Sequence, residues 1–163
     1  MRTGNSIQNK ILTLPELLQR VSQWRVVNKT IAFTNGCYDI LHAGHIASLT
    51  EASRQGDYLV VAVNADSSIK GLKGDNRPVN DENARALVLA ALSMVDAVII
   101  FPEPTPLDLV VAIRPEVLVK GGDYKVEEIA GAREVISWGG KVVLNPIVEG
   151  YSTTSIINKL QNK

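Results

Sequence analysis

Short apolar runs alternate with amphipathic stretches along the chain. Each run is rich in valine, isoleucine and leucine and is bounded by polar or turn-forming residues. Runs of this kind are typical of strands that are buried on both faces of a parallel sheet. The pattern predicts five strands, at Thr30–Phe33, Tyr58–Asn64, Asp96–Phe101, Val117–Lys120 and Lys141–Leu144.

Between these runs, apolar residues recur at the spacing of a helix turn. The first such segment has a clear start, because Thr13, Pro15 and Glu16 occupy the positions of a capping box with proline in the first turn. The predicted helices are Leu14–Trp24, Ile46–Ser53, Asp81–Met94, Leu107–Ile113, Glu127–Trp138 and Ser152–Leu160.

The alternation of strands and helices predicts an α/β protein with a parallel sheet, covered on both faces through right-handed crossovers. We expect a Rossmann-like three-layer fold with a five-stranded parallel sheet, in a single domain over residues 1–163. Ligands of such folds bind beyond the carboxyl ends of the strands. The stretch Ser67–Asn80 is predicted to be a long polar loop that could cover this site.

The two histidines of the chain, His42 and His45, lie on either side of Gly44. Their loop follows the first predicted strand and leads into a helix, and the free N–H groups of a helix start suit phosphate. Two imidazoles placed there could stabilise the charge that builds on phosphate oxygens during nucleotidyl transfer. Gly44 would let a phosphate approach the backbone closely.

Asp39 and Cys37 leave other roles open for this loop. Asp39 could orient an imidazole or bind a cation, and with His42 and His45 it could form a zinc or iron site. The chain has no further histidine to complete such a site. Cys37 is interpreted as a small packing residue, and a catalytic role for its thiol would need a lowered pKa.

The pattern Gly36-x-x-Asp39-x-x-His42-x-Gly44-His45 closely resembles the signature of the HxGH nucleotidyltransferases. This superfamily includes glycerol-phosphate cytidylyltransferases, pantetheine-phosphate adenylyltransferases and class I aminoacyl-tRNA synthetases. Three further segments look like the adenylyltransferase half of the bifunctional heptose-phosphate kinase/adenylyltransferases. They are Lys73–Asn80, Val119–Tyr124 and Gly150–Ile157. The resemblance extends from about residue 14 to residue 161.

The resemblance implies transfer of AMP from ATP to D-glycero-β-D-manno-heptose 1-phosphate, a step toward the lipopolysaccharide inner core. His42 and His45 would stabilise the transition state, and Lys73 and Arg77 would hold phosphates, with Mg²⁺ offsetting the triphosphate charge. The chain carries no sugar-kinase half, so we expect a stand-alone enzyme with a separate kinase and phosphatase. The expected ATP-binding residues are Asn35, Gly36, Cys37, Tyr38, Asp39, Gly44, Asn64, Lys120, Gly121, Gly122, Asp123, Gly150, Ser152, Thr153 and Thr154.

Two segments depart from the related cytidylyltransferases. Their arginine-tyrosine-valine-aspartate segment is Ser93–Asp96 here, and their arginine-threonine-glutamate-glycine segment is Ile147–Gly150, so both arginines are absent. This argues against the first alternative, a glycerol-phosphate or ethanolamine-phosphate cytidylyltransferase. The second alternative is a nucleotide-sensing module without catalysis, which would not require both histidines.

Composition adds limits on partners and compartment. The 163 residues contain 17 basic and 17 acidic side chains, so no global positive field favours nucleic acid or an anionic membrane. The polar start Met1–Lys10 lacks the apolar core of a signal peptide, and no run approaches the ~20 residues that span a bilayer. One cysteine excludes an intramolecular disulfide. We expect a cytoplasmic protein and, by analogy with relatives, a homodimer.

Overall fold

The computed structural model describes residues 7–74, 76–122, 124–146 and 150–161. Its strands are β1 (Ile31–Gly36), β2 (Tyr58–Asn64), β3 (Ala97–Phe101), β4 (Val117–Gly121) and β5 (Lys141–Asn145). Its helices are α1 (Leu14–Val26), α2 (Ala43–Ser53), α3 (Asp66–Lys73), α4 (Glu82–Ala90), α5 (Leu107–Ile113), α6 (Ala132–Ser137) and α7 (Thr153–Gln161), with 3₁₀ turns η2 (Gln8–Lys10) and η3 (Val126–Glu128).

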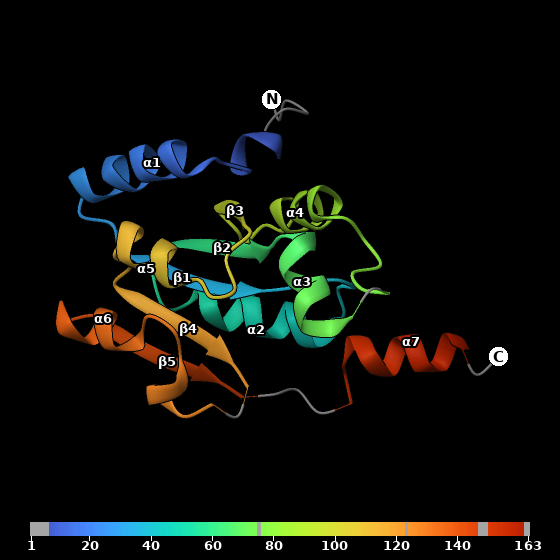
Figure 1. Ribbon diagram of the computed structural model, residues 1–163. Coiled ribbons are helices and arrows are strands. Elements are labelled where there is room, and N and C mark those ends of the chain that lie inside the picture. The colour runs from blue at the N-terminus through green and yellow to red at the C-terminus, as the bar shows by residue number, and fades with distance from the viewer. Residues whose placement is uncertain (1–6, 75, 123, 147–149, 162–163) are drawn as a thin grey trace.

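The strands form one parallel sheet in the order β3-β2-β1-β4-β5, with β1 in the centre (Figure 1). The chain builds one side of the sheet from β1 to β3 and then crosses back to add β4 beside β1. The carboxyl ends of β1 and β4 therefore form the switch point at which ligands bind in folds of this type. The predicted Rossmann-like α/β fold with a five-stranded parallel sheet is confirmed.

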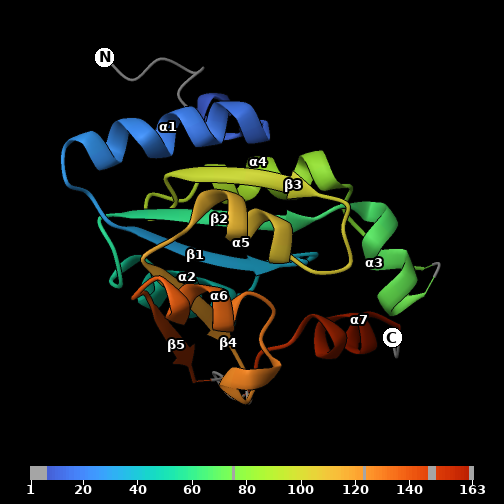
Figure 2. The ribbon, with the colours of Figure 1, turned by 60° about the vertical axis from the view of Figure 1, so that its left-hand side comes forward.

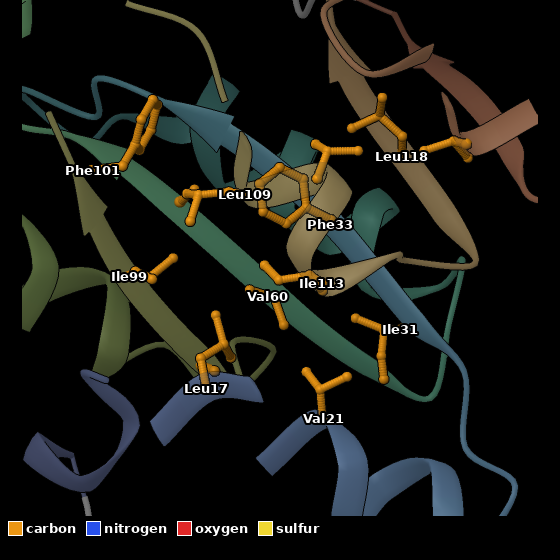
Figure 3. Close-up of a cluster of buried hydrophobic side chains, with 14 of the residues drawn as sticks. Leu17, Val21, Ile31, Phe33, Val60, Ile99, Phe101, Leu109, Ile113 and Leu118 are labelled. Atoms are coloured by element: carbon orange, nitrogen blue, oxygen red, sulfur yellow. The ribbon is translucent and has the colours of Figure 1, made fainter. Parts of the chain in front are cut away.

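Helices cover both faces of the sheet, and in Figure 2 α5 and α6 lie in front of the strands while α2 and α4 lie behind them. Buried side chains of α1, α5 and α6 pack on one face, and those of α2 and α4 pack on the other. Successive residues of β1 divide between the two layers, because Ile31 and Phe33 join the first core and Ala32 joins the second (Figure 3). Full burial of each large apolar side chain stabilises the fold by about 1.5–3 kcal/mol.

The start of the chain follows its sequence signals closely. Thr13 and Glu16 form the expected capping box at the start of α1, with the Thr13 N–H donating to the Glu16 carboxylate at 2.8 Å. The run Leu59–Asn64 is buried throughout, which explains why β2 shows no alternation of polar and apolar residues. None of the described helices has the length and apolar character that a bilayer crossing requires.

Three predicted segments need correction. Ser67–Asn80 is wrong as a continuous loop, because α3 occupies its first half. Only Ile69 of α3 is buried, so the helix has a single apolar anchor and a polar composition that conceals it. The predicted helix Glu127–Trp138 is broken at Gly131, whose φ of 89° separates η3 from α6. The predicted helix Asp81–Met94 ends at Ala90, with Asp81 as its N-cap.

The remaining correction bears on the site. Helix α2 begins at Ala43 rather than Ile46, so His42 is its N-cap residue and His45 lies in its first turn. The histidines are therefore part of a helix start rather than of the loop before it. In Figure 1, α3 and α7 lie near the same end of the sheet as this helix start.

Candidate active site

A cavity of about 500 Å³ opens at the carboxyl ends of β1 and β4. Its walls come from the end of β1, the start of α2, the end of α3, the segment after β3, the end of β4 and the start of α7. This is the switch point of the sheet, where the topology predicts a ligand. The lining residues that the sequence predicted are Asn35, Gly36, Cys37, Tyr38, Asp39, His45, Asn64, Lys73, Lys120, Gly121 and Thr153.

The two histidine rings are stacked on each other at the start of α2. The ring centroids of His42 and His45 are 3.9 Å apart, and the ring planes differ by 26°. Tyr38 meets His45 edge-on from the other side, at 5.4 Å between centroids. Both Nδ1 atoms are buried with no hydrogen-bond partner among the residues that the structure describes. Ring packing holds the pair, and the backbone of Ile40 also interacts with the His45 imidazole.

Burial controls the protonation of the pair. It lowers the pKa of His42 and, together with the nearby His42 and Lys73, lowers the pKa of His45 to about 4. Both rings are therefore neutral near pH 7, and each carries a single N–H. A neutral imidazole in a cavity can donate to a phosphate oxygen without adding a full charge to its unliganded site.

Gly44 makes room for protein atoms rather than for open space. A Cβ there would lie 3.0 Å from Nδ1 and 3.1 Å from Cε1 of His42, and 3.2 Å from Cβ of Tyr151. The glycine thus allows the His42 ring to fold back over the helix start beneath Tyr151. Close approach of a phosphate to this backbone stays a prediction.

Two lysines line the cavity from different elements. Lys120, on β4, is half-buried, and its Nζ donates to Oδ1 of Asn35 at 3.3 Å and lies 5.5 Å from the ring centroid of Tyr124. Burial lowers the pKa of Lys120. Lys73, at the end of α3, is exposed at the rim. These side chains place local positive charge in a molecule whose formal net charge is zero.

The carboxylate of Asp39 has hydrogen-bond partners other than the histidines. Its buried carboxylate accepts from Nε of Arg77 at 2.6 Å and from the N–H groups of Val79 and Asn80 at 2.8 and 3.0 Å. These donors lower the pKa of Asp39 against the opposing effect of burial. The expectation that Asp39 orients an imidazole is wrong, because its oxygens hold the Arg77–Asn80 segment instead.

Two of the roles that the sequence left open for Asp39 involve a metal: binding a cation, and forming a zinc or iron site with His42 and His45. Within the described ranges, no group of three histidine, cysteine, aspartate or glutamate side chains is placed to hold a metal.

Arg77, expected to bind phosphate, uses Nε for Asp39, while its Nη2 is buried with no partner in the described part of the chain. The Nε edge of the Arg77 guanidinium is therefore occupied by its bond to Asp39.

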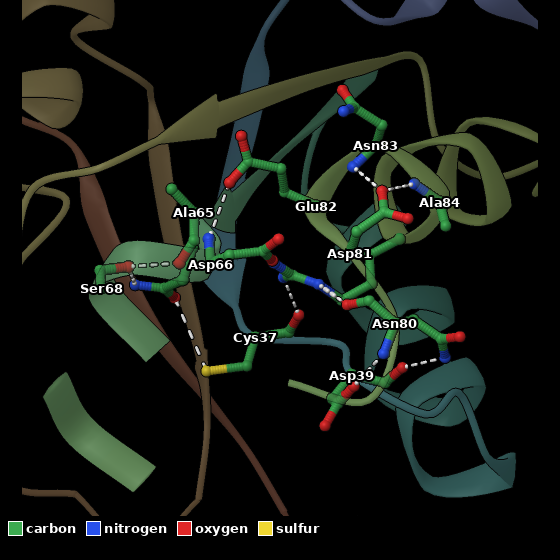
Figure 4. Close-up of polar contacts among 12 residues, drawn as sticks. Cys37, Asp39, Ala65, Asp66, Ser68, Asn80, Asp81, Glu82, Asn83 and Ala84 are labelled. Atoms are coloured by element: carbon green, nitrogen blue, oxygen red, sulfur yellow. Dashed lines mark hydrogen bonds and ion pairs between the residues drawn. The ribbon is translucent and has the colours of Figure 1, made fainter. Parts of the chain in front are cut away.

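A second buried cation, Arg85 of α4, joins the segments that carry Cys37, Asp66 and Asn80, which Figure 4 labels. It is 2% exposed and donates to the carbonyls of Cys37 and Asn80 at 2.6 and 3.0 Å and to the Asp66 carboxylate at 2.7 Å. Sequence reasoning missed Arg85, since an arginine within an amphipathic helix is normally solvent-exposed. Its contacts fix the β1–α2 loop to the start of α3.

The thiol of Cys37 and the amide of Asn64 meet at the cavity wall. The Cys37 Sγ lies 4.0 Å from Oδ1 of Asn64, whose Nδ2 donates to the Ser68 hydroxyl at 3.4 Å. Cys37 is half-buried and lines the cavity. The interpretation of Cys37 as a packing residue stays a prediction.

The start of α7 lies against the histidine loop. The hydroxyl of Thr153 donates to the Ile40 carbonyl at 3.4 Å, and the Ser152 hydroxyl accepts from the N–H of Ser155 at 3.0 Å. Ser152 therefore caps the helix, while Thr153 lines the cavity. Three of the predicted residues here, Gly150, Ser152 and Thr154, are not part of its wall.

Other predicted residues also lie outside the cavity wall. They are His42, Gly44, Arg77 and Gly122, and Asp123 lies outside the described residues. The lining residues that sequence reasoning missed are Thr34, Ser48, Leu72, Pro104, Thr105, Pro106, Tyr124, Glu128, Ile129 and Ala130. The segment Pro104–Pro106 could have been found, because it follows β3 and the carboxyl ends of parallel strands share one edge.

The cytidylyltransferase-like family model matches residues 33–159, which include the histidine pair and the start of α7. The chain belongs to the cytidylyltransferase-like family.

Curated proteins that are similar to this chain are named bifunctional protein HldE. The chain is 56% identical over 152 residues to the bifunctional protein HldE of Koribacter versatilis, covering 93% of this chain and 31% of the relative. It is 51% identical over 162 residues to HldE of Acidiphilium cryptum, covering 99% of this chain and 33% of the relative. These matches confirm the resemblance to the bifunctional enzymes, and the chain spans about a third of their length.

Solved structures extend the comparison to the fold. A lipopolysaccharide core biosynthesis protein from Thermoplasma volcanium superposes with a TM-score of 0.62 at 30% identity, covering 77% of this chain and all of that one. A pantoate-beta-alanine ligase from Francisella tularensis superposes with a TM-score of 0.61 at 14% identity, covering 94% of this chain and 78% of the ligase. The second likeness shows the shared fold alone.

Proposed function

We propose that the protein transfers AMP from ATP to D-glycero-β-D-manno-heptose 1-phosphate and releases pyrophosphate. The observation that carries this proposal is the stacked pair His42 and His45 at a helix start beside a lysine-lined cavity. The family match and the HldE relatives support it. The product would be ADP-heptose for the lipopolysaccharide inner core.

The reaction is a single displacement at phosphorus. An oxygen of the sugar 1-phosphate attacks the α-phosphate of ATP, and the bond from the α-phosphorus to the pyrophosphate oxygen breaks. Because the acceptor is itself the nucleophile, no covalent enzyme intermediate is needed. His42 and His45 donate their N–H groups to oxygens that gain charge in the transition state.

Cationic and helix-start groups hold the two anionic substrates together. Lys120 and Lys73 lie at two sides of the cavity, and Thr153 brings the start of α7 to its wall. The N–H groups of that helix start take the terminal phosphates of ATP. For Arg77 to bind a phosphate as well, its buried Nη2 would have to become exposed to the cavity while Nε keeps its bond to Asp39.

Mg²⁺ enters this proposal as part of the MgATP substrate. It prefers oxygen ligands, and the buried carboxylate of Asp39 already accepts three hydrogen bonds from the protein. Phosphate oxygens and water therefore hold the ion, which offsets triphosphate charge. The protein acts in the cytoplasm as a homodimer on small molecules, without a nucleic-acid or membrane partner.

Pyrophosphate release across a substrate panel tests this function. ATP with heptose 1-phosphate should turn over far better than CTP with glycerol 3-phosphate, and turnover should require added Mg²⁺. The His42→Ala variant serves as the blank for contaminating activity. Efficient turnover of CTP with glycerol 3-phosphate would replace the proposal with a cytidylyltransferase. Binding of ATP without pyrophosphate release, across all acceptors, would favour a nucleotide-sensing module.

A further inference from the structure

The ring of Tyr151 lies beside that of His42 at the start of α2. The ring centroids of His42 and Tyr151 are 6.4 Å apart, and the planes differ by only 18°. His42 thus has two nearly parallel ring neighbours, His45 and Tyr151. A separation of 6.4 Å is within the range of favourable aromatic pairs.

The backbone around Tyr151 fixes where its ring can lie. Its Cβ lies 3.2 Å from the position of a Cβ on Gly44, so the tyrosine packs against the first turn of α2. Two residues later, the Thr153 hydroxyl donates to the Ile40 carbonyl in the histidine loop at 3.4 Å. The start of α7 is therefore attached to the loop that carries His42.

His42 needs an external support for its ring. As the N-cap residue it has extended backbone angles, φ −144° and ψ 171°, and its side chain makes no capping hydrogen bond. Its Nδ1 has no hydrogen-bond partner among the described residues. Packing between His45 and Tyr151 is then what selects one ring orientation.

We propose that Tyr151 is a positioning residue that holds the His42 imidazole over the start of α2 in the orientation used for catalysis. The proposal rests on the proposed function of His42. The tyrosine acts through its ring face, since the contact is a stack and its side chain is half exposed to solvent. It keeps His42 ordered and partly shielded from water before the substrates bind.

Shielding has a measurable consequence for protonation. Burial lowers the pKa of His42, so removal of the covering ring should raise that pKa toward the ordinary value of 6.5. The other titratable groups around the rings are His45 and Lys73, while the Asp39 carboxylate is paired with Arg77. All of these side chains are retained when Tyr151 is replaced.

The test compares Tyr151→Leu, Tyr151→Phe and the control Leu160→Ala, which removes an exposed side chain from the far end of α7. Proton NMR follows the imidazole signals through a pH titration, with His42→Ala used for assignment. In Tyr151→Leu the His42 signals should shift and its pKa should rise. With ATP and heptose 1-phosphate, kcat should fall about tenfold with less than a twofold change in the KM for ATP. Tyr151→Phe and Leu160→Ala should match the unmodified protein.

Two results would overturn the inference. Unchanged His42 signals and pKa in Tyr151→Leu would show that the ring does not hold the imidazole. A loss of kcat in Tyr151→Phe as large as in Tyr151→Leu would assign the effect to the hydroxyl. Full activity in His42→Ala would instead count against the proposed function, and the NMR titration would still decide whether the stack exists.

Discussion

Two groups of buried polar side chains lie close together at the carboxyl edge of the sheet, and they differ in how their hydrogen bonds are used. Asp39 accepts three hydrogen bonds, and Arg85 donates three. In contrast, His42 and His45 each keep a buried Nδ1 without a partner in the described part of the chain.

The difference separates support from chemistry. A buried polar network with its hydrogen bonds made is rigid and resists change, whereas an unpaired buried group costs stability and calls for an explanation, such as a catalytic role. The Asp39 and Arg85 contacts hold the loops in place, whereas each imidazole keeps a nitrogen that the described protein groups do not use. Each of the following experiments tests that division.

The largest effect is expected at the unpaired group. His42→Ala or His45→Ala should lower kcat by roughly 10²–10⁴-fold, since each change removes a charge-stabilising donor. The measurement is steady-state pyrophosphate release, with Thr50→Ala on the same helix as the control. The double variant should lose less than the product of the single losses, because both rings act on one developing charge. Near-normal turnover in both single variants would remove the histidines from the mechanism.

Loss of the Asp39 hydrogen bonds should lower the free energy of unfolding. Asp39→Ala leaves Arg77 and the N–H groups of Val79 and Asn80 without their acceptor, so the free energy of unfolding should fall by about 3–5 kcal/mol. Urea denaturation measures it. Glu51→Ala removes an exposed carboxylate paired with Arg54, and its cost should stay within about 1 kcal/mol. Similar losses in the two variants would show that the Asp39 network does not support the loop.

Arg77 belongs to both groups, and its fork can be divided by experiment. Arg77→Ala should lower kcat/KM roughly 10- to 150-fold, the loss of one charge-assisted hydrogen bond to phosphate. Arg77→Lys keeps the charge and loses the fork, so it should recover only part of that loss. If Arg77 serves Asp39 alone, the change should cost stability and leave the kcat/KM of the folded fraction intact.

The sequence could predict much of this fold because its strands are buried on both faces. Leu59–Asn64 shows that burial directly as an uninterrupted apolar run closed by one asparagine. Helix α3 was missed because Ile69 is its only buried residue. Gly131 interrupts a helix that periodicity predicts as continuous, because its φ of 89° is positive and Val110 leaves no room for a Cβ there.

The site was predictable where its residues are close in sequence. His42, Gly44 and His45 form a recognisable motif within four positions. Arg85 reaches the site from a distant element, and nothing in its local sequence shows where the fold places it. Tyr151 lies between Gly150 and Ser152, in a segment that the sequence assigned to the site, but its contact with His42 depends on the fold. Asp39 shows the opposite error, since its place in the motif suggested the histidines as partners, and the fold provided Arg77.

Acid should weaken the fold through His45. Its folded-state pKa of about 4 lies below the ordinary 6.5, so between these values the unfolded chain binds more protons. The free energy of unfolding should therefore fall as pH drops from 6.5 toward 4, and His45→Gln should flatten this slope. Chemical denaturation at several pH values compares the two proteins, and carboxylates common to both cancel in the difference. Equal slopes would mean that His45 is not shielded from solvent.

The smallest effect is expected at Gly44, where activity and stability should move in opposite directions. A Cβ at this position lies 3.0 Å from Nδ1 of His42 and 3.2 Å from Cβ of Tyr151, so both side chains must shift by a few tenths of an ångström. We expect Gly44→Ala to lower kcat about tenfold, because catalysis depends on ring placement. Alanine also favours the helix by roughly 0.5–1 kcal/mol, so the fold should be no less stable unless the two rings cannot move.

Gly71→Ala on α3 is the control: a Cβ there meets nothing within 4 Å, so this variant gains the same helix stabilisation without a new contact. Loss of stability in Gly44→Ala, with Gly71→Ala stabilised, would show that the His42 stack is rigid. Unchanged kcat would show that its placement does not limit the reaction.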